Sequence, residues 1–256
     1  MSQPPDLYQF TFSHYNEKAR WALDYKGIPH RRISLLPGPH MAVIKKVTGG
    51  ESSQVPVLRD GGEVIAASDA ILEHLERTHP TPALFPADGE ARRAALALAR
   101  WFDEEVGPHV RCAFFFDILP DTRYAASCFA LGHTPLKRAV YRAGFPATRV
   151  LMRRMMAIDD ASAEAGRKRL AEALDRVVAE AGPEGYLVGE RFSVADLTAA
   201  SLLMPAVFPP GMEPALPEPE SPGMARWRER WADHPGARWV RSVYARHRGR
   251  SAALPG

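Results

Sequence analysis

The chain has 256 residues, of which 46% are hydrophobic and 25% charged, as in an ordinary folded globular protein. No apolar run approaches the ~18 residues that a membrane span needs, so we expect no contact with a membrane. The net charge of +3 is too small to indicate nucleic acid as a partner.

Cysteine usage and the first residues of the chain point to a cytoplasmic protein. Cys112 and Cys128 lie apart, and neither stands at metal-ligand spacing from other ligand residues. We therefore expect reduced thiols and no metal. The chain begins MSQPPD, without a basic segment and apolar core, so we expect no secretory signal.

The opening stretch, residues 7–28, predicts a strand that passes through a short polar connection into a helix. Aromatic and polar residues alternate over residues 7–12, which is typical of a strand. From residue 16 the apolar residues recur at helical spacing, and Gly27 closes the helix. Ser13 stands just before this helix, whose unpaired N–H groups and dipole would stabilise an anion. The alternative for Ser13 is a plain N-cap.

The next fifty residues continue the alternation of strands and helices. Residues 30–36 are expected to be extended, whereas residues 40–53 give at most one irregular helical turn. Residues 55–59 and 63–66 read as a hairpin joined by an Asp-Gly-Gly turn. The pattern predicts a compact α/β unit with a mixed sheet.

Pro56 lies inside a predicted strand and needs an explanation, because proline cannot donate to a sheet. It is either a trans edge proline or part of a cis Val55–Pro56 bond. The cis form would turn the Val55 N–H and C=O outward, toward an extended ligand. After the hairpin, we expect Ser68 to cap a helix that has Asp69 in its first turn.

The proline-rich stretch 78–86 predicts a domain boundary, with one domain over residues 1–80 and an all-helical domain over residues 87–256. The helical segments expected first are residues 90–106, residues 134–158 as two pieces split at 144–146, and residues 160–181. Residues 107–134 are aromatic, but prolines and a glycine interrupt them, and their structure is ambiguous.

Residues 186–203 carry the clearest local signal of the second half. Ser193 and Asp196 have the spacing of a capping box, and Phe192 and Leu197 that of a hydrophobic staple. We interpret this buried helix as a folding element without a catalytic role. Residues 205–222 are expected to form a proline-rich surface loop, followed by two amphipathic helices and a short tail.

Three stretches of this sequence together resemble the glutathione transferase family. They are FSHYNEKARWALDYKGI, QVPVL…VIAASDAILEHL and YLVGERFSVADLTAASLL, in the family's order and separations. The resemblance implies an α/β plus all-α fold: a thioredoxin-like N-terminal domain that binds glutathione, followed by an all-helical domain that supplies most of the second-substrate pocket. It also implies a homodimer. The resemblance is weak over 107–160 and 205–256.

The resemblance assigns roles to individual residues. Ser13 matches the hydroxyl of the serine-type (theta- and zeta-like) classes, which donates to the glutathione thiolate and does not itself attack. Val55 with Pro56 matches the element whose backbone pairs with the cysteinyl part of glutathione. Ser68 matches the hydroxyl that binds the γ-glutamyl carboxylate. The full set expected at glutathione is His14, Gln54, Val55, Pro56, Ser68 and Asp69.

One departure from the family pattern concerns affinity for glutathione. Ala67 stands where many members have a glutamate or glutamine, so a contact to the γ-glutamyl group is lost. Such a contact is worth ~1.5–3 kcal/mol, which corresponds to a tenfold to hundredfold change in affinity.

The function expected from the resemblance is a glutathione transferase that acts on a small hydrophobic electrophile. A glutathione-dependent isomerase or lyase, and a catalytically silent binding or assembly protein of the same fold, are the alternatives. Tyr15, Phe114 and Phe115 are expected in the second-substrate pocket, and His14 and Tyr15 are alternative donors. The aromatic residues around 114–116 and the methionines of 152–156 form either a pocket wall or core packing. The basic residues of 137–154 are interpreted as a solvated helix face rather than a site for nucleic acid or an acidic substrate.

Overall fold

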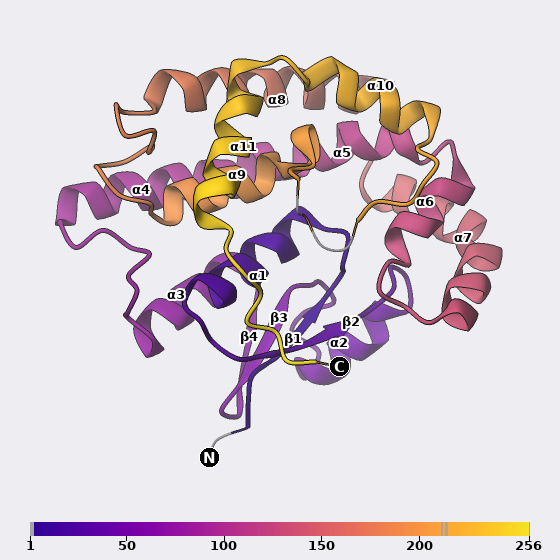
Figure 1. The fold of residues 1–256 in the computed structure, drawn as a ribbon. Coiled ribbons are helices and arrows are strands. Elements are labelled where there is room, and N and C mark those ends of the chain that lie inside the picture. The colour runs from indigo at the N-terminus through magenta and orange to yellow at the C-terminus, as the bar shows by residue number, and fades with distance from the viewer. Residues whose placement is uncertain (1–2, 211, 213–214, 256) are drawn as a thin grey trace.

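The computed structural model describes residues 3–210, 212 and 215–255. An α/β part formed by the first eighty residues lies below a larger group of helices in Figure 1. This arrangement confirms the predicted fold class, a thioredoxin-like domain followed by an all-helical domain. Among the described residues, no helix has the length and apolar character needed to cross a bilayer.

The sheet has four strands in the order β2-β1-β3-β4, and it is mixed as predicted. Its strands are β1 (Asp6–Gln9), β2 (Arg31–Ser34), β3 (Val57–Asp60) and β4 (Glu63–Ala66). Strands β1 and β2 are parallel, whereas β1–β3 and the β3–β4 hairpin are antiparallel.

Strand β1 ends three residues earlier than the alternation of residues 7–12 predicts. Phe12 leaves the sheet because its ring packs against aromatic rings of the helical part. Its ring centroid lies 5.8 Å from those of Phe114 and Phe129, and it stacks on Phe208 at 6.1 Å. Contact between the two parts of the chain therefore overrides the strand pattern here.

Helices cover both faces of the sheet. Helices α1 (His14–Tyr25) and α3 (Ser68–Thr78) bury Leu7 and Leu58 in the main core. Helix α2 (His40–Val47) covers the other face, where Ile44 packs near Tyr8 and Val57. Residues 40–47 are thus a regular helix, longer than the single irregular turn expected.

Helix α3 begins differently from the prediction. Its N-cap is Ala67, which makes no side-chain capping bond, and Ser68 is already the first helical residue. Ala67 has φ of 78°, because its N–H bonds back to the carbonyl of Pro56 across the end of the hairpin. This backbone bond turns the chain into the helix one residue early, so the expected Ser68 cap is wrong.

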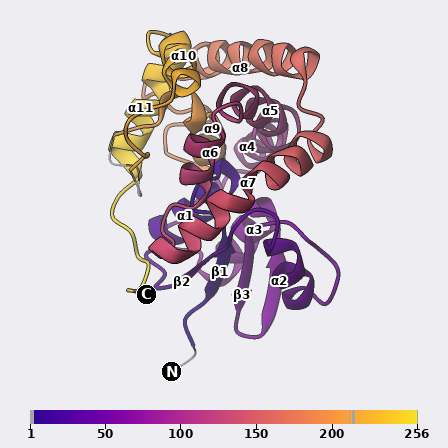
Figure 2. The ribbon, with the colours of Figure 1, turned by 90° about the vertical axis from the view of Figure 1, so that its right-hand side faces the viewer.

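Beyond residue 88, most of the described residues are helical. The helices are α4 (Gly89–Trp101), a π-helical turn η1 (Phe102–Val106), α5 (Gly107–Ile118), α6 (Thr122–Phe129), α7 (Pro135–Met155), α8 (Asp160–Glu180), α9 (Val194–Val207), α10 (Pro222–Trp231) and α11 (Pro235–His247). Every residue of α9 is buried, and α7 lies at the periphery (Figures 1 and 2). The Ser193–Asp196 capping box at the start of α9 is confirmed.

Two prolines lie inside helices that the sequence predicts to stop there. Helix α7 runs through Pro146 as one helix, because Tyr141, Phe145 and Met152 hold a single buried stripe along it. Helix α9 continues through Pro205, whose carbonyl accepts a bond from the indole N–H of Trp227 over 2.6 Å. The predicted break at 144–146 and the loop start at residue 205 are therefore wrong. Residues 211, 213 and 214 of that expected loop lie outside the described residues.

The C-terminal tail runs back along the α/β part and ends beside β2 (Figure 1). Arg248 pairs with both Glu17 and Asp24 of α1, at 2.6 and 2.9 Å. The Leu254 N–H donates to the carbonyl of His30. The tail thus ties the last helix to the helix that begins at Ser13.

Candidate functional site

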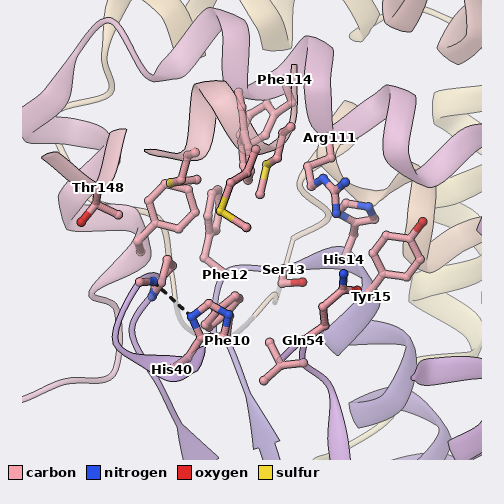
Figure 3. A pocket seen from close by; sticks show the side chains of 18 of the residues that line it. Phe10, Phe12, Ser13, His14, Tyr15, His40, Gln54, Arg111, Phe114 and Thr148 are labelled. Carbon is pink, nitrogen blue, oxygen red and sulfur yellow. Dashed lines mark hydrogen bonds between the residues drawn. The ribbon is translucent and has the colours of Figure 1, made fainter. Parts of the chain in front are cut away.

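A cavity of about 250 Å³ lies where the N-terminus of α1 faces α5, α7 and α9 (Figure 3). It brings together seven residues singled out from the sequence: Ser13, His14, Tyr15, Gln54, Val55, Phe114 and Phe115. Pro56, Ser68 and Asp69 are not among the residues that line it. Ser68 is buried at the start of α3, and Asp69 is exposed.

Ser13 is the N-cap of α1 and is half-buried at the cavity wall. Its Oγ accepts two bonds from Asn16, from the backbone N–H at 3.4 Å and from the side-chain amide at 2.7 Å. With its acceptor positions used in this way, the hydroxyl can direct its own proton into the cavity. Ser13 is therefore both a helix cap and a donor at the cavity wall.

His14 is buried and neutral. Its Nε2 donates to the carbonyl of Gly107 over 3.2 Å, and its ring lies 4.7 Å from that of Tyr15. Burial, together with the charge of Arg111, lowers the pKa of His14 to about 3. The imidazole is thus not a cation at neutral pH.

The hydroxyl of Tyr15 is hydrogen-bonded to the helical domain. Its hydroxyl donates to the backbone carbonyl of Asp103 over 2.6 Å, and burial raises its pKa. Asp103 lies in the π-helical turn, where the N–H of Gly107 bonds to the carbonyl of Phe102 five residues back. The next residue, Pro108, has no N–H, so the Asp103 carbonyl is left free for the tyrosine.

The Val55–Pro56 bond is cis, one of the two alternatives that the sequence left open. Within the described part of the chain, no hydrogen bond reaches the backbone N–H or C=O of Val55. Val55 and Gln54 line the cavity together with His40, the first residue of α2.

The far wall of the cavity is apolar. Phe114 and Phe115 of α5 face it, together with Phe129, Leu151, Met152, Met155, Met156, Met204 and Phe208. The methionines 152–156 and two of the phenylalanines 114–116 therefore form a pocket wall, while Phe116 lies outside it beneath Arg167. The exposed lysine and arginines at 137, 138 and 142 fit the predicted solvated face of α7.

Sequence reasoning missed five polar residues of the site: Asn16, His40, Ser53, Arg111 and Thr148. Asn16 stands three residues after an N-cap serine, a spacing that is a usable signal for a bond to the serine hydroxyl. His40 and Arg111 line the cavity, and no local pattern marks them. No group of three or more metal-ligating side chains occurs among the residues that the structure describes.

A thioredoxin-like domain with a hydroxyl at the start of its first helix, joined to a helical domain across an apolar cavity, is the arrangement of glutathione transferases. The model of the glutathione S-transferase N-terminal domain matches residues 7–83, and that of the C-terminal domain matches residues 160–230. This chain belongs to the glutathione S-transferase family.

Individual relatives match to different extents. A maleylpyruvate isomerase from Ralstonia sp. is 38% identical over 95 residues, which are 36% of this chain and 44% of that protein. The FtsZ-localized protein A of Caulobacter vibrioides is 25% identical over 205 residues, covering 79% of this chain and 77% of that one. The chain thus spans less than half the length of the isomerase that it matches.

The fold is also that of solved glutathione transferases. The crystal structure of one from Rhodospirillum rubrum superposes with a TM-score of 0.62 at 22% identity, over 95% of this chain and 89% of that chain.

Proposed function

We propose that this protein is a glutathione-dependent transferase that uses Ser13 to stabilise the glutathione thiolate for attack on a hydrophobic electrophile. The observation that carries the proposal is the Ser13 hydroxyl, held by Asn16 at the N-terminus of α1 and facing an apolar cavity.

The chemistry follows from charge. A thiol has an unperturbed pKa of about 8.5, so little thiolate is present at neutral pH. A hydrogen bond from Ser13, together with the dipole of α1, favours the thiolate and lowers that pKa. The sulfur then donates its electron pair to an electrophilic carbon, and the leaving group departs with the electron pair of the broken bond.

Features of the α/β part support a place for the rest of glutathione. The Val55 backbone beside the cis proline would pair with the cysteinyl part, with Gln54 and His14 next to it. Helix α3 begins without a side-chain cap, so its first N–H groups are available to an anion. The γ-glutamyl carboxylate would lie there, at Ser68 and Asp69. Tyr15, Phe114 and Phe115 would border the electrophile.

The test is a calorimetric titration of glutathione, followed by the ultraviolet absorbance of the bound thiolate as a function of pH. Replacing Ser13 by alanine should raise the thiolate pKa by about one to two units, the equivalent of a hydrogen bond to a charged group. Ser127→Ala, at a half-buried serine of α6 outside the cavity, is the matched control. An unchanged thiolate pKa in Ser13→Ala would refute the role of Ser13.

A glutathione-dependent isomerase is the second candidate, favoured by the similarity to the Ralstonia maleylpyruvate isomerase. The same thiolate would add to a cis double bond, rotation would follow about the resulting single bond, and elimination would return the thiolate. Incubation with maleylpyruvate and glutathione, followed by chromatography for the trans product, distinguishes this reaction from transfer, which consumes glutathione.

A binding or assembly role is favoured by a different observation. The relative that matches over most of both chains is named as an FtsZ-localized protein, and Ala67 removes a contact to glutathione. Retention on immobilised glutathione separates the two ideas, because a purely assembling protein should not be retained. Binding to purified FtsZ would then be the direct assay.

We also propose a homodimer located in the cytoplasm. Light scattering during gel filtration would give the mass in solution, and a value of one chain would refute the dimer.

A further inference from the structure

We propose that Arg111 binds a carboxylate of the co-substrate, so that the cavity selects a hydrophobic electrophile with a single negative charge. The chemical step rests on the proposed function, but the binding of the carboxylate does not.

Arg111 lies on the face of α5 that forms the cavity wall. It precedes Phe114 and Phe115 by three and four residues, so the three side chains share one helix face. Figure 3 shows its guanidinium beside His14, on the same side of the cavity as Ser13. A ligand that pairs with Arg111 can therefore lay its apolar part against the two rings.

The guanidinium of Arg111 has no anionic partner among the described residues. It takes part in none of the ion pairs found there, and its Nε is buried without a hydrogen-bond partner. Two other inward-facing arginines differ from it, since Arg20 pairs with Glu17 and Arg248 pairs with Glu17 and Asp24. A partly buried charge without a partner costs free energy, which an incoming carboxylate would recover.

The other residues that line the cavity indicate that the co-substrate carries a single negative charge. Among the described lining residues, Arg111 is the only lysine, arginine, aspartate or glutamate. The neighbouring His14 is neutral, and the opposite wall is mainly phenylalanine and methionine side chains, with the uncharged Thr148 at its edge. A second carboxylate on the ligand would face these apolar groups and lose its hydration without compensation. The site therefore fits one carboxylate attached to an apolar body.

The first experiment measures binding without chemistry. Calorimetric titrations compare para-phenylbenzoate with the neutral para-phenylbenzamide on the full chain. The wild type should bind the acid about tenfold or more tightly than the amide, and Arg111→Met should remove that preference while keeping amide binding. Arg111→Lys should restore part of it, and Arg138→Met, which removes an exposed charge on α7, should change neither. Equal binding of acid and amide by the wild type, or no binding of either, would overturn the proposal.

The second experiment follows turnover of ethacrynic acid and its methyl ester with saturating glutathione. The thiolate forms a C–S bond with the terminal methylene carbon, the π electron pair moves to the carbonyl oxygen, and the enolate takes a proton from water. Arg111→Met should raise KM for the acid about 10- to 100-fold and leave that for the ester unchanged.

Other outcomes of the turnover experiment are equally informative. The same rise in KM for acid and ester, or weaker binding of glutathione alone, would show that Arg111 shapes the pocket or holds glutathione, and would overturn the proposal. If the wild type turns over neither compound, the proposed function fails, while the benzoate titration still decides the role of Arg111.

Discussion

Asn16 donates its side-chain amide to the Ser13 hydroxyl oxygen over 2.7 Å, and both residues belong to the first turn of α1 and its cap. The bond fixes the oxygen as an acceptor on the helix side. The proton of Ser13 is therefore available on the cavity side, where the proposed thiolate would lie. Asn16 itself is fully buried and does not line the cavity, so we regard it as a positioning residue.

Replacing Asn16 by alanine should weaken the proposed thiolate site without removing Ser13. A neutral hydrogen bond contributes about 1 kcal/mol, so the thiolate pKa should rise by somewhat less than one unit. Asn16→Asp should raise it further, because a carboxylate beside the thiolate disfavours the second negative charge. Thiolate absorbance as a function of pH measures both. A thiolate pKa that is equal in Asn16→Ala and wild type would show that Ser13 needs no such support.

His14 should make stability depend on pH in the acid range. Its pKa falls from 6.5 in the unfolded chain to about 3 in the folded one, because burial disfavours the cation. As the pH falls, His14 therefore takes up its proton in the unfolded state at a higher pH than in the folded state. The contribution to stability is complete above about pH 6.5 and is lost as the pH falls toward 3, by about 1.4 kcal/mol per pH unit.

The measurement for His14 is urea unfolding at a series of pH values for wild type and His14→Gln. Glutamine keeps an N–H donor for the Gly107 carbonyl but does not titrate. The difference between the two curves isolates His14 from the other histidines. If the free energies of unfolding of wild type and His14→Gln change with pH in parallel between pH 6 and pH 4, the buried imidazole is not kept neutral by folding.

Gly107 should be essential for the contact between the two domains. A Cβ at this position would lie 2.7 Å from Cζ of Tyr15, closer than the two atoms can approach. Gly107→Ala should therefore displace the Tyr15 ring and destabilise the protein by about 1–3 kcal/mol. Gly144→Ala in α7 is the control, since no atom lies within 4 Å of its added Cβ. There the change should stabilise by about 0.5–1 kcal/mol.

Chemical unfolding of both glycine variants tests this contrast. If Gly107→Ala is as stable as Gly144→Ala, the Tyr15 ring is free to move, and its bond to Asp103 contributes little.

Much of the fold could be predicted because its signals are local. The Asp-Gly-Gly turn of the β3–β4 hairpin and the Ser193 capping box of α9 each act within a few residues, and the structure confirms both. The end of β1 could not be predicted, since Phe12 leaves the sheet only to meet rings far along the chain. The continuity of α7 through Pro146 likewise depends on which of its residues are buried against the rest of the protein.

The residues of the candidate site also fall into those that local sequence predicts and those that it does not. Ser13 and Val55 each belong to a short motif, so the sequence predicts both as site residues, and both line the cavity. Arg111 lies in the aromatic stretch 107–134, where the sequence did not determine the helix, and hence the face that meets the cavity was unknown. His40, the first residue of α2, lies at the cavity with its ring packed edge-on against that of Phe10, which follows β1. Both positions are set by packing between segments far apart in sequence.

The last prediction concerns Ala67, the residue that departs from the family pattern. Its side chain is exposed beside the start of α3, and its φ of 78° is unusual for a residue with a Cβ. Ala67→Gln should restore a contact to the γ-glutamyl group and tighten glutathione binding about 10- to 100-fold, because that group is charged. Ala67→Gly should leave glutathione affinity unchanged but stabilise the fold by about 1 kcal/mol, because glycine adopts positive φ without strain.

The pair of Ala67 variants separates affinity from stability. Calorimetry gives Kd for glutathione, and thermal unfolding without ligand gives the effect on the fold. Tighter binding in Ala67→Gln alone would place the γ-glutamyl group beside α3, because only a ligand contact distinguishes the two substitutions in that measurement. Equal Kd values in Ala67→Gln and wild type would mean that glutathione does not reach this helix. The proposed arrangement along Val55 and Ser68 would then be wrong, even if Ser13 still lowers the thiol pKa.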